Sequence, residues 1–324
     1  MSKAMLTAAF VLATVSTMAA AQEWPSRAIT LIVPFTAGGG IDASARLQAA
    51  TLSEVLGQTV VVENIGAAGG TVGSARVAKA APDGYTLLIG NTGTHAYSQA
   101  LYKKLPYDAA KDFEPVGLVT ESPRILLARK DLPVNNLKEF IAYAKANQGK
   151  MQYGSAGVGS GTHLPCALLN MTMGVDITHV PYRGAGAVMQ DLVGGRIDYM
   201  CDTIQTGAVQ ANSGTVKGIA VMSPKRVPVV SGLPTTGEQG LAGAEATVWN
   251  AYFFPKGTPQ PIVRKMNKAL GDMLARADFR EKSEALGLAL VPPEQRSPEY
   301  LAKYLGEEIE RWGKVIRAGG ISVD

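Results

Sequence analysis

The sequence has few aromatic residues, almost no excess of one charge, and only two cysteines. Phe, Trp and Tyr make up 6% of the 324 residues, and 31 Lys and Arg stand against 27 Asp and Glu. No basic block stands out, which argues against a nucleic-acid-binding surface. Two cysteines exclude a disulfide-dense scaffold but allow one bridge. After the N-terminal segment, no apolar run is long enough to cross a bilayer.

The N-terminal segment has the pattern of a secretory signal peptide. Lys3 is the sole charged residue before Glu23, an apolar run covers 6–12, and three alanines end at Ala21. A membrane anchor is the alternative, but the apolar run is short and rich in Ala, Ser and Thr. We therefore expect cleavage near Ala21 and an exported chain that begins at Gln22.

Apolar runs alternate with helical segments along the rest of the chain, which predicts an α/β protein with parallel strands and helices on both faces. The expected strands are 28–35, 59–63, 85–90, 151–155, 178–182, 197–201 and 218–222. The expected helices are one that begins at Ile41, then 71–81, 137–146, 163–173 and 187–193, and two amphipathic helices around 262–273 and 301–316.

The alternation starts again in the middle of the chain, as if a second α/β unit were inserted into the first. Two crossings between the units, near 118–127 and 222–226, would form a two-strand hinge. The domain organisation expected from this pattern is a signal peptide over 1–21, a first domain of 22–123 plus 224–324, and an inserted second domain of 124–223.

Two glycine-rich turns, PFTAGGGID over 34–42 and SAGVGSGTH over 155–163, each follow a strand and precede a helix. Helix N-termini offer free N–H groups, and glycine permits close backbone approach, as we expect at Gly39. Asp42 is expected to cap its helix or to order the loop. The alternative is two ordinary tight turns; neither turn has the spacing of a dinucleotide-binding or P-loop motif.

An exported hydrolase is the alternative function. It would use one of the three histidines, His163, with the nearby hydroxyl of Ser160 or Thr162. No G-x-S-x-G elbow accompanies them, so a catalytic site is not the favoured interpretation.

The two cysteines leave three interpretations open. In an exported protein, Cys166 and Cys201 are expected to form a disulfide, with buried thiols as the second possibility. A zinc site made with His163 and His179 is the third, but the C-x-x-C pairs of structural zinc sites are missing. We expect no metal and no cofactor.

Motifs over the whole mature chain point to one family. In order they are WPSRAI (24–29), IVPFTAGGGID (32–42), VVVEN (60–64), GAAGG (66–70), APDGYTLL (81–88), YGSAG (153–157), HL (163–164) and HVPYRG (179–184). Together they resemble the Bug receptors, the periplasmic substrate-binding components of tripartite tricarboxylate transporters. Pro165-Cys166 and 64–66 (NIG) depart from the usual pattern of that family.

The resemblance implies a two-domain periplasmic-binding-protein fold of the Venus-flytrap, type II-like kind, with a central cleft and a two-strand hinge. It implies a monomeric receptor in the periplasm, and not an enzyme, that passes a small carboxylate to membrane transporter subunits. A dicarboxylate is favoured because two helix N-termini suit two anionic ends. A sensor that presents its ligand to a signalling partner would have the same fold.

The same resemblance places the ligand-binding residues in loops of both domains. Arg183 is the one cation in these loops, and it either binds one end of a dicarboxylate or is a surface arginine. The expected contacts are Phe35, Thr36, Ala37, Gly38, Gly39, Asn91, Thr92, Ser155, Ala156, Gly159, Thr162, His163, Arg183, Asp202 and Thr203.

Overall fold

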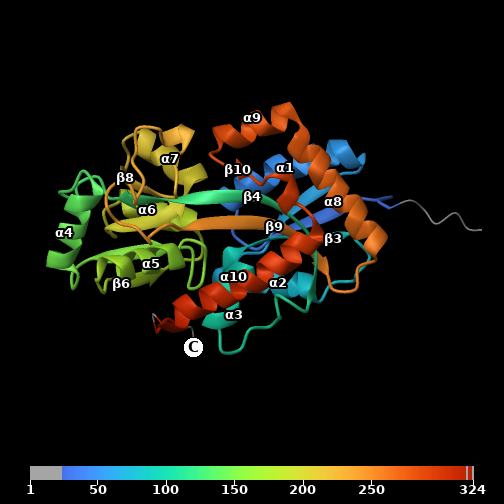
Figure 1. Ribbon diagram of the computed structural model, residues 1–324, viewed down its shortest axis with the longest axis horizontal. Coiled ribbons are helices and arrows are strands. Elements are labelled where there is room, and N and C mark those ends of the chain that lie inside the picture. The colour runs from blue at the N-terminus through green and yellow to red at the C-terminus, as the bar shows by residue number, and fades with distance from the viewer. Residues whose placement is uncertain (1–23, 319, 323–324) are drawn as a thin grey trace, which may run out of the picture.

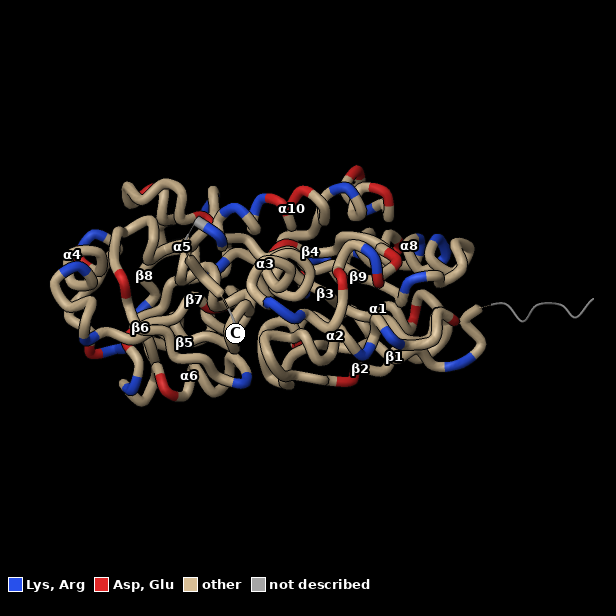
Figure 2. Tube along the Cα trace, turned by 90° about the horizontal axis from the view of Figure 1, so that it is seen from below, with Lys and Arg blue, Asp and Glu red and all other residues tan. Residues whose placement is uncertain are grey.

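The computed structural model describes residues 24–318 and 320–322, so the expected signal peptide lies outside the described residues. Figure 1 shows an elongated α/β molecule with two lobes, in which helices cover both faces of a curled sheet. Positive and negative residues alternate over both lobes, with no stripe of one sign (Figure 2). Within the described chain, no helix combines the length and apolar character needed to cross a membrane.

The strands of the described residues form one ten-stranded sheet, whose main path runs β2-β1-β3-β9-β4-β7-β5-β6, with β8 and β10 also paired to β4. Their bounds are β1 Ile29–Val33, β2 Val60–Asn64, β3 Thr86–Asn91, β4 Phe113–Ala128, β5 Gln152–Ser155, β6 Thr178–Pro181, β7 Tyr199–Thr203, β8 Lys217–Met222, β9 Thr247–Pro255 and β10 Ala289–Leu290. Pairs β1–β2, β1–β3, β5–β6 and β5–β7 are parallel, whereas β9 pairs antiparallel with both β3 and β4.

Helices connect these strands and cover both faces of the sheet. The α-helices are α1 Gly40–Leu56, α2 Thr71–Ala78, α3 Ser98–Leu101, α4 Leu137–Asn147, α5 Leu164–Met173, α6 Ala185–Val193, α7 Ile204–Asn212, α8 Gln260–Ala275, α9 Ala277–Ala285 and α10 Pro298–Ala318. The short helical turns are η1 Ala68–Gly70, η2 Gly93–Tyr97, η3 Pro228–Val230 and η4 Pro293–Gln295. The helices and strands expected from the sequence are confirmed within a few residues, and β4 contains the expected crossing 118–127. Strands β9 and β10 and helices α3, α7 and α9 were not foreseen.

Two long antiparallel strands, β4 and β9, join the two halves of the molecule (Figure 1). The first part of β4 pairs with β9, whereas its last five residues, 124–128, pair with β7 and β8. The second crossing is therefore β9 and not the expected segment 222–226. The physical reason is that residues 227–246 are held by the second half, where Val227, Val230, Ala244 and Ala246 pack in its hydrophobic cores.

Each half has apolar cores on both faces of its part of the sheet. In the first half, α1 and α8 bury one face, and α10 with η2 covers the other. In the second half, α4 and α5 pack on one face and α6 and α7 on the other. Cys166 of α5 and Cys201 of β7 are joined by a disulfide, with their Cα atoms 5.4 Å apart. This bridge ties α5 to the strand beneath it.

Candidate functional site

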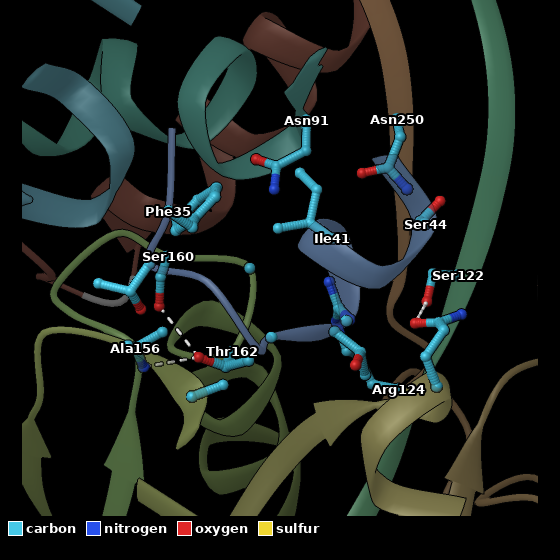
Figure 3. Close-up of a pocket in the computed structure, with 18 of the residues that line it drawn as sticks. Phe35, Ile41, Ser44, Asn91, Ser122, Arg124, Ala156, Ser160, Thr162 and Asn250 are labelled. Atoms are coloured by element: carbon cyan, nitrogen blue, oxygen red, sulfur yellow. Dashed lines mark hydrogen bonds between the residues drawn. The ribbon is translucent and has the colours of Figure 1, made fainter. Parts of the chain in front are cut away.

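A small cavity of about 50 Å³ lies between the two halves, beside β4 and β9 (Figure 3). Residues from both halves line it, so its walls exist only when the halves are close together. The lining residues are Phe35, Thr36, Gly39, Gly40, Ile41, Ser44, Asn91, Ser122, Arg124, Ala156, Ser160, Gly161, Thr162, Gly184, Ala185, Thr203, Gln205, Asn250 and Leu288.

Four helices of the described chain begin at the wall of this cavity. Helix α1 starts at Gly40, α6 at Ala185 and α7 at Ile204, directly after the lining residue Thr203, and α5 starts just after the lining segment 160–162. No side chain in the described chain caps any of these four N-termini. The first-turn N–H groups of α1, α6 and α7 and the positive ends of these three dipoles therefore converge on one small volume, which favours an anion. Helix α5 adds no such donors, because the Leu164 N–H already donates to the Ser160 carbonyl and Pro165 has no N–H.

The first-half loop is held in shape by Asp42, in the first turn of α1. Its carboxylate accepts hydrogen bonds from the Gly38 N–H at 2.9 Å, from Arg46 Nε at 3.1 Å and from Asn64 Nδ2 at 2.9 Å. Asn64 Nδ2 also donates to the Phe35 carbonyl. These hydrogen bonds hold the pKa of Asp42 below its usual value despite its burial, so the group stays ionised. Asp42 thus orders the loop without contacting the cavity.

Asp42→Ala is expected to lower the free energy of unfolding by about 1–3 kcal/mol, because three donors lose their charged acceptor. Ligand binding should also weaken, since the 35–40 loop loses its anchor. Urea denaturation and isothermal titration measure the two effects. Asp272→Ala is the matched control, because Asp272 is exposed in α8 and forms an ion pair with the exposed Lys268. Equal effects of the two substitutions would contradict the positioning role.

The second-half loop is held by its own side chains and by a pair of histidines. Thr162 Oγ1 accepts from the Ala156 N–H at 2.8 Å and lies 3.1 Å from Ser160 Oγ, as the dashed lines of Figure 3 show. His163 Nδ1 accepts from the Gly159 N–H at 3.1 Å. The neighbouring ring, His179, has its Nε2 atom 2.7 Å from Ser155 Oγ. The two imidazole rings are stacked 3.9 Å apart.

His163 is buried, His179 is half-buried, and both rings are neutral. Burial lowers the pKa of His163 to about 3 and that of His179 to about 4, with the neighbouring His179 as a further cause for His163. Since the Gly159 amide occupies His163 Nδ1, this ring positions a loop and does not activate the hydroxyl of Ser160 or Thr162. With both cysteines in the disulfide, the zinc set has no thiolates left, and the described residues contain no cluster suited to a metal ion.

Small residues let the two halves meet closely around the cavity. A Cβ atom on Gly184 would overlap Thr36 Oγ1 across the gap, and one on Gly40 would overlap Thr203 Oγ1. Tyr102 adds a polar contact, because its hydroxyl lies 2.9 Å from the Ala68 carbonyl of the first half and 2.9 Å from the Val158 carbonyl of the second. Gly39, in contrast, has room for a side chain: the nearest atom to its Cβ would be the Thr36 carbonyl, 3.9 Å away.

The cavity brings together seven of the residues expected from the sequence: Phe35, Thr36, Gly39, Asn91, Ala156, Thr162 and Thr203. Three of the others hold neighbouring backbone or side chains: Thr92 Oγ1 accepts from the Trp249 N–H, Ser155 bonds to His179, and the Gly159 N–H donates to His163. Ala37 and Gly38 are exposed outside the cavity.

Two expected contacts need correction for a physical reason. Arg183 is exposed and does not line the cavity, because the turn after β6 presents Gly184 and Ala185 inward instead. Asp202 is buried but follows Cys201 on the face of β7 that packs against α7, where its Oδ2 accepts from Thr206 Oγ1. Neither side chain lines the cavity.

Sequence reasoning missed the polar groups at the hinge end of the cavity. Ser122 and Arg124 belong to β4, Gln205 begins α7, and Asn250 belongs to β9. Figure 3 shows Ser122, Arg124 and Asn250 on one side of Ile41, and Ser160, Thr162 and Ala156 on the other. The only signal available was a single arginine within the predicted hinge segment 118–127.

Comparison with known proteins defines the class. A family model described as "Tripartite tricarboxylate transporter family receptor" matches residues 44–321. Protein BugT of Bordetella pertussis is 33% identical over 93% of this chain and 91% of its own length. Among solved structures, MatC of Rhodopseudomonas palustris with bound malate is 44% identical, with a TM-score of 0.86 over 90% of this chain and 100% of that chain.

A second protein from R. palustris, solved with adipate, is 36% identical and gives a TM-score of 0.88 over 93% of this chain and 99% of that chain. The fold is therefore that of a periplasmic binding protein, a solute receptor and not an enzyme. The chain belongs to the family of tripartite tricarboxylate transporter receptors, and the resemblance seen in its sequence is confirmed. Membership of this family places it in the periplasm.

Proposed function

We propose that this protein captures a small carboxylate in the cavity between its two halves and delivers it to the membrane subunits of a tripartite transporter. One observation carries the proposal: the N-termini of α1, α6 and α7, which have no side-chain cap in the described chain, surround one cavity between the halves. Their N–H groups are an anion site with no need of a surface cation, and the family supplies the transporter context.

Dicarboxylates are the favoured ligands within this class. The similar structures from R. palustris hold malate and adipate, both dicarboxylates. The cavity has polar groups at two ends, Ser160 and Thr162 at one and Ser122 and Gln205 at the other. With a volume of about 50 Å³, it favours a small ligand over a large one.

Capture requires the halves to move apart and close again. We propose that 24–123 with the chain from β9 onward forms one rigid domain, that 124–246 forms the other, and that β4 and β9 act as the hinge between them. Support comes from the cores, which are separate in the two halves, and from the two strands that cross between them. A monomer whose signal peptide is cleaved near Ala21 completes the proposal.

A thermal-shift screen with malate, adipate, succinate, citrate, hexanoate and 3-hydroxybutyrate tests the function. At a hundredfold excess over its Kd, a ligand that binds only the folded state stabilises it by about 2.7 kcal/mol, which moves the midpoint by several degrees. We expect the largest shift from a dicarboxylate, with a 1:1 stoichiometry by isothermal titration. No shift with any carboxylate would refute the proposal.

A further inference from the structure

Arg124 lines the cavity at its hinge end, and we propose that its guanidinium binds one carboxylate of the ligand directly. The inference rests on the proposed function and adds the group that selects for a ligand with a second carboxylate. In Figure 3 the Arg124 side chain extends from β4 toward the centre of the cavity, near Ile41.

The charge of Arg124 is buried and forms no ion pair within the described chain. Burial lowers its pKa, and the nearby Tyr97 and Asp202 raise it in part. The residue is 3% exposed, and its Nε and Nη1 atoms have no hydrogen-bond partner among the described residues. Burying a charge is costly unless it is paired, and buried polar groups in folded proteins almost always have partners. An unpaired guanidinium beside an enclosed cavity therefore points to an anion that belongs to the ligand.

The nearest buried carboxylate cannot fill this role, because it lies on the other face of the sheet. In the β4–β7 ladder, Arg124 is opposite Thr203, and Asp202 is opposite the next residue along, Ile125. Successive side chains of a strand point to opposite faces, so Arg124 shares its face with Thr203 and not with Asp202. Asp202 Oδ2 accepts from Thr206 instead, and no ion pair forms with Arg124.

The guanidinium stays charged and has a second donor nearby. Burial lowers the pKa of Arg124 to about 10, well above neutral pH, so the cation persists when the halves are closed. Gln205 Oε1 accepts from Ser122 Oγ at 2.9 Å, which leaves Gln205 Nε2 as a donor with no partner in the described chain. A planar guanidinium matches a carboxylate with two parallel hydrogen bonds, and an amide N–H can add a third.

The arrangement also explains why Arg183 is not needed. Arg183 is exposed and screened by water, where an ion pair adds little. Arg124 is shielded from solvent by Gly161 of the second-half loop, whose Cβ position would lie 2.9 Å from Arg124 Nη2. A carboxylate that enters this end of the cavity replaces its bound water by a fixed cation. The attraction between the two charges is stronger there than at the surface, because less water screens it.

The test compares Arg124→Met with the wild-type protein by isothermal titration. The ligands are malate with its analogue 3-hydroxybutyrate, and adipate with its analogue hexanoate, in which a methyl group replaces one carboxylate. We expect Arg124→Met to weaken the dicarboxylate by about tenfold to hundredfold, and to remove most of the preference over the monocarboxylate. Arg124→Lys keeps the charge but loses the planar pair of donors, so its dicarboxylate affinity should lie between those of wild type and Arg124→Met.

The unfolding temperature without ligand shows whether a variant has lost a ligand contact or has lost its fold. Since methionine removes an unpaired buried charge, Arg124→Met without ligand should unfold at the same temperature as wild type or higher. Arg129→Met is the matched control. Arg129 directly follows β4 and pairs with Asp131 and Asp198, so this change should lower the unfolding temperature and leave ligand affinity unchanged.

A crystal structure of the wild-type complex provides a test that needs no variant, with a ligand carboxylate expected within hydrogen-bond distance of Arg124. Dicarboxylate affinity in Arg124→Met within about twofold of wild type, or a bound carboxylate that does not contact Arg124, would overturn this assignment alone. If the wild-type protein binds none of the four acids, the assignment falls together with the proposed function.

Discussion

Gly184→Val is expected to abolish ligand binding while each half still folds. Gly184 has an extended backbone, φ −180°, so valine is not strained there. Its Cβ would, however, overlap Thr36 Oγ1 of the opposite half, which forces the halves apart and opens the cavity. Since affinity scales with the fraction of closed protein, we expect a loss on the order of a hundredfold or more by isothermal titration.

Gly186→Val is the matched control for this prediction. Gly186 lies two residues further along, in α6, and its Cβ position has no atom within 4 Å. This variant should bind like wild type, with the same circular dichroism spectrum as Gly184→Val. In solution scattering, Gly184→Val should keep the larger radius of gyration of the open form when ligand is added. Normal binding by Gly184→Val would show that the contact with Thr36 plays no part in closure.

Stability is expected to fall steeply between pH 6.5 and pH 4, because His95 and His163 are buried, and His179 is half-buried, as neutral rings. Burial lowers the pKa of His95 and of His163 to about 3 and that of His179 to about 4, against about 6.5 when unfolded. The unfolded chain then binds protons that the folded chain does not, so stability rises with pH and is lost on acidification.

The expected loss by pH 4 is roughly 6–7 kcal/mol from His95 and His163, and the partly exposed His179 adds a smaller amount. Asp202 offsets a small part, since burial raises the pKa of its carboxyl. Urea denaturation at pH 7, 6, 5 and 4 measures the effect. His95 stacks on Phe253 with ring centres 4.1 Å apart, so His95→Phe keeps the packing and should remove about half of the pH dependence. Equal stability at pH 7 and pH 5 would contradict the neutral-histidine account.

The sequence predicted the fold well because the fold rests on periodic local patterns. Runs such as 59–63 and 218–222 are β-branched and bounded by turn residues, and the structure places strands there. Strand β9 was missed although TVWNAYFFP is apolar and rich in strand-forming residues. Its partner is β4, and no local signal shows that these two distant segments pair along the hinge.

The sequence predicted part of the candidate site and missed the rest, for a physical reason. Residues such as Gly39 and Thr162 could be predicted, because they lie in glycine-rich turns that precede helices, and the positions of these turns are visible in the sequence. Side-chain direction does not follow in the same way. Arg183 lies in a binding loop yet points to solvent, while Arg124 lies in a strand and points into the cavity, because the register of β4 decides its face.

The disulfide between α5 and β7 has a consequence for when the receptor matures. The cytoplasm keeps thiols reduced, whereas the periplasm permits oxidation, so Cys166 and Cys201 join only after the chain has left the cell interior. A disulfide that closes a loop of 35 residues lowers the conformational entropy of the unfolded chain. In the chain-entropy model this raises the free energy of unfolding by about 3–4 kcal/mol. A newly made chain, whose cysteines are still reduced, therefore lacks this part of its stability and acquires it in the periplasm.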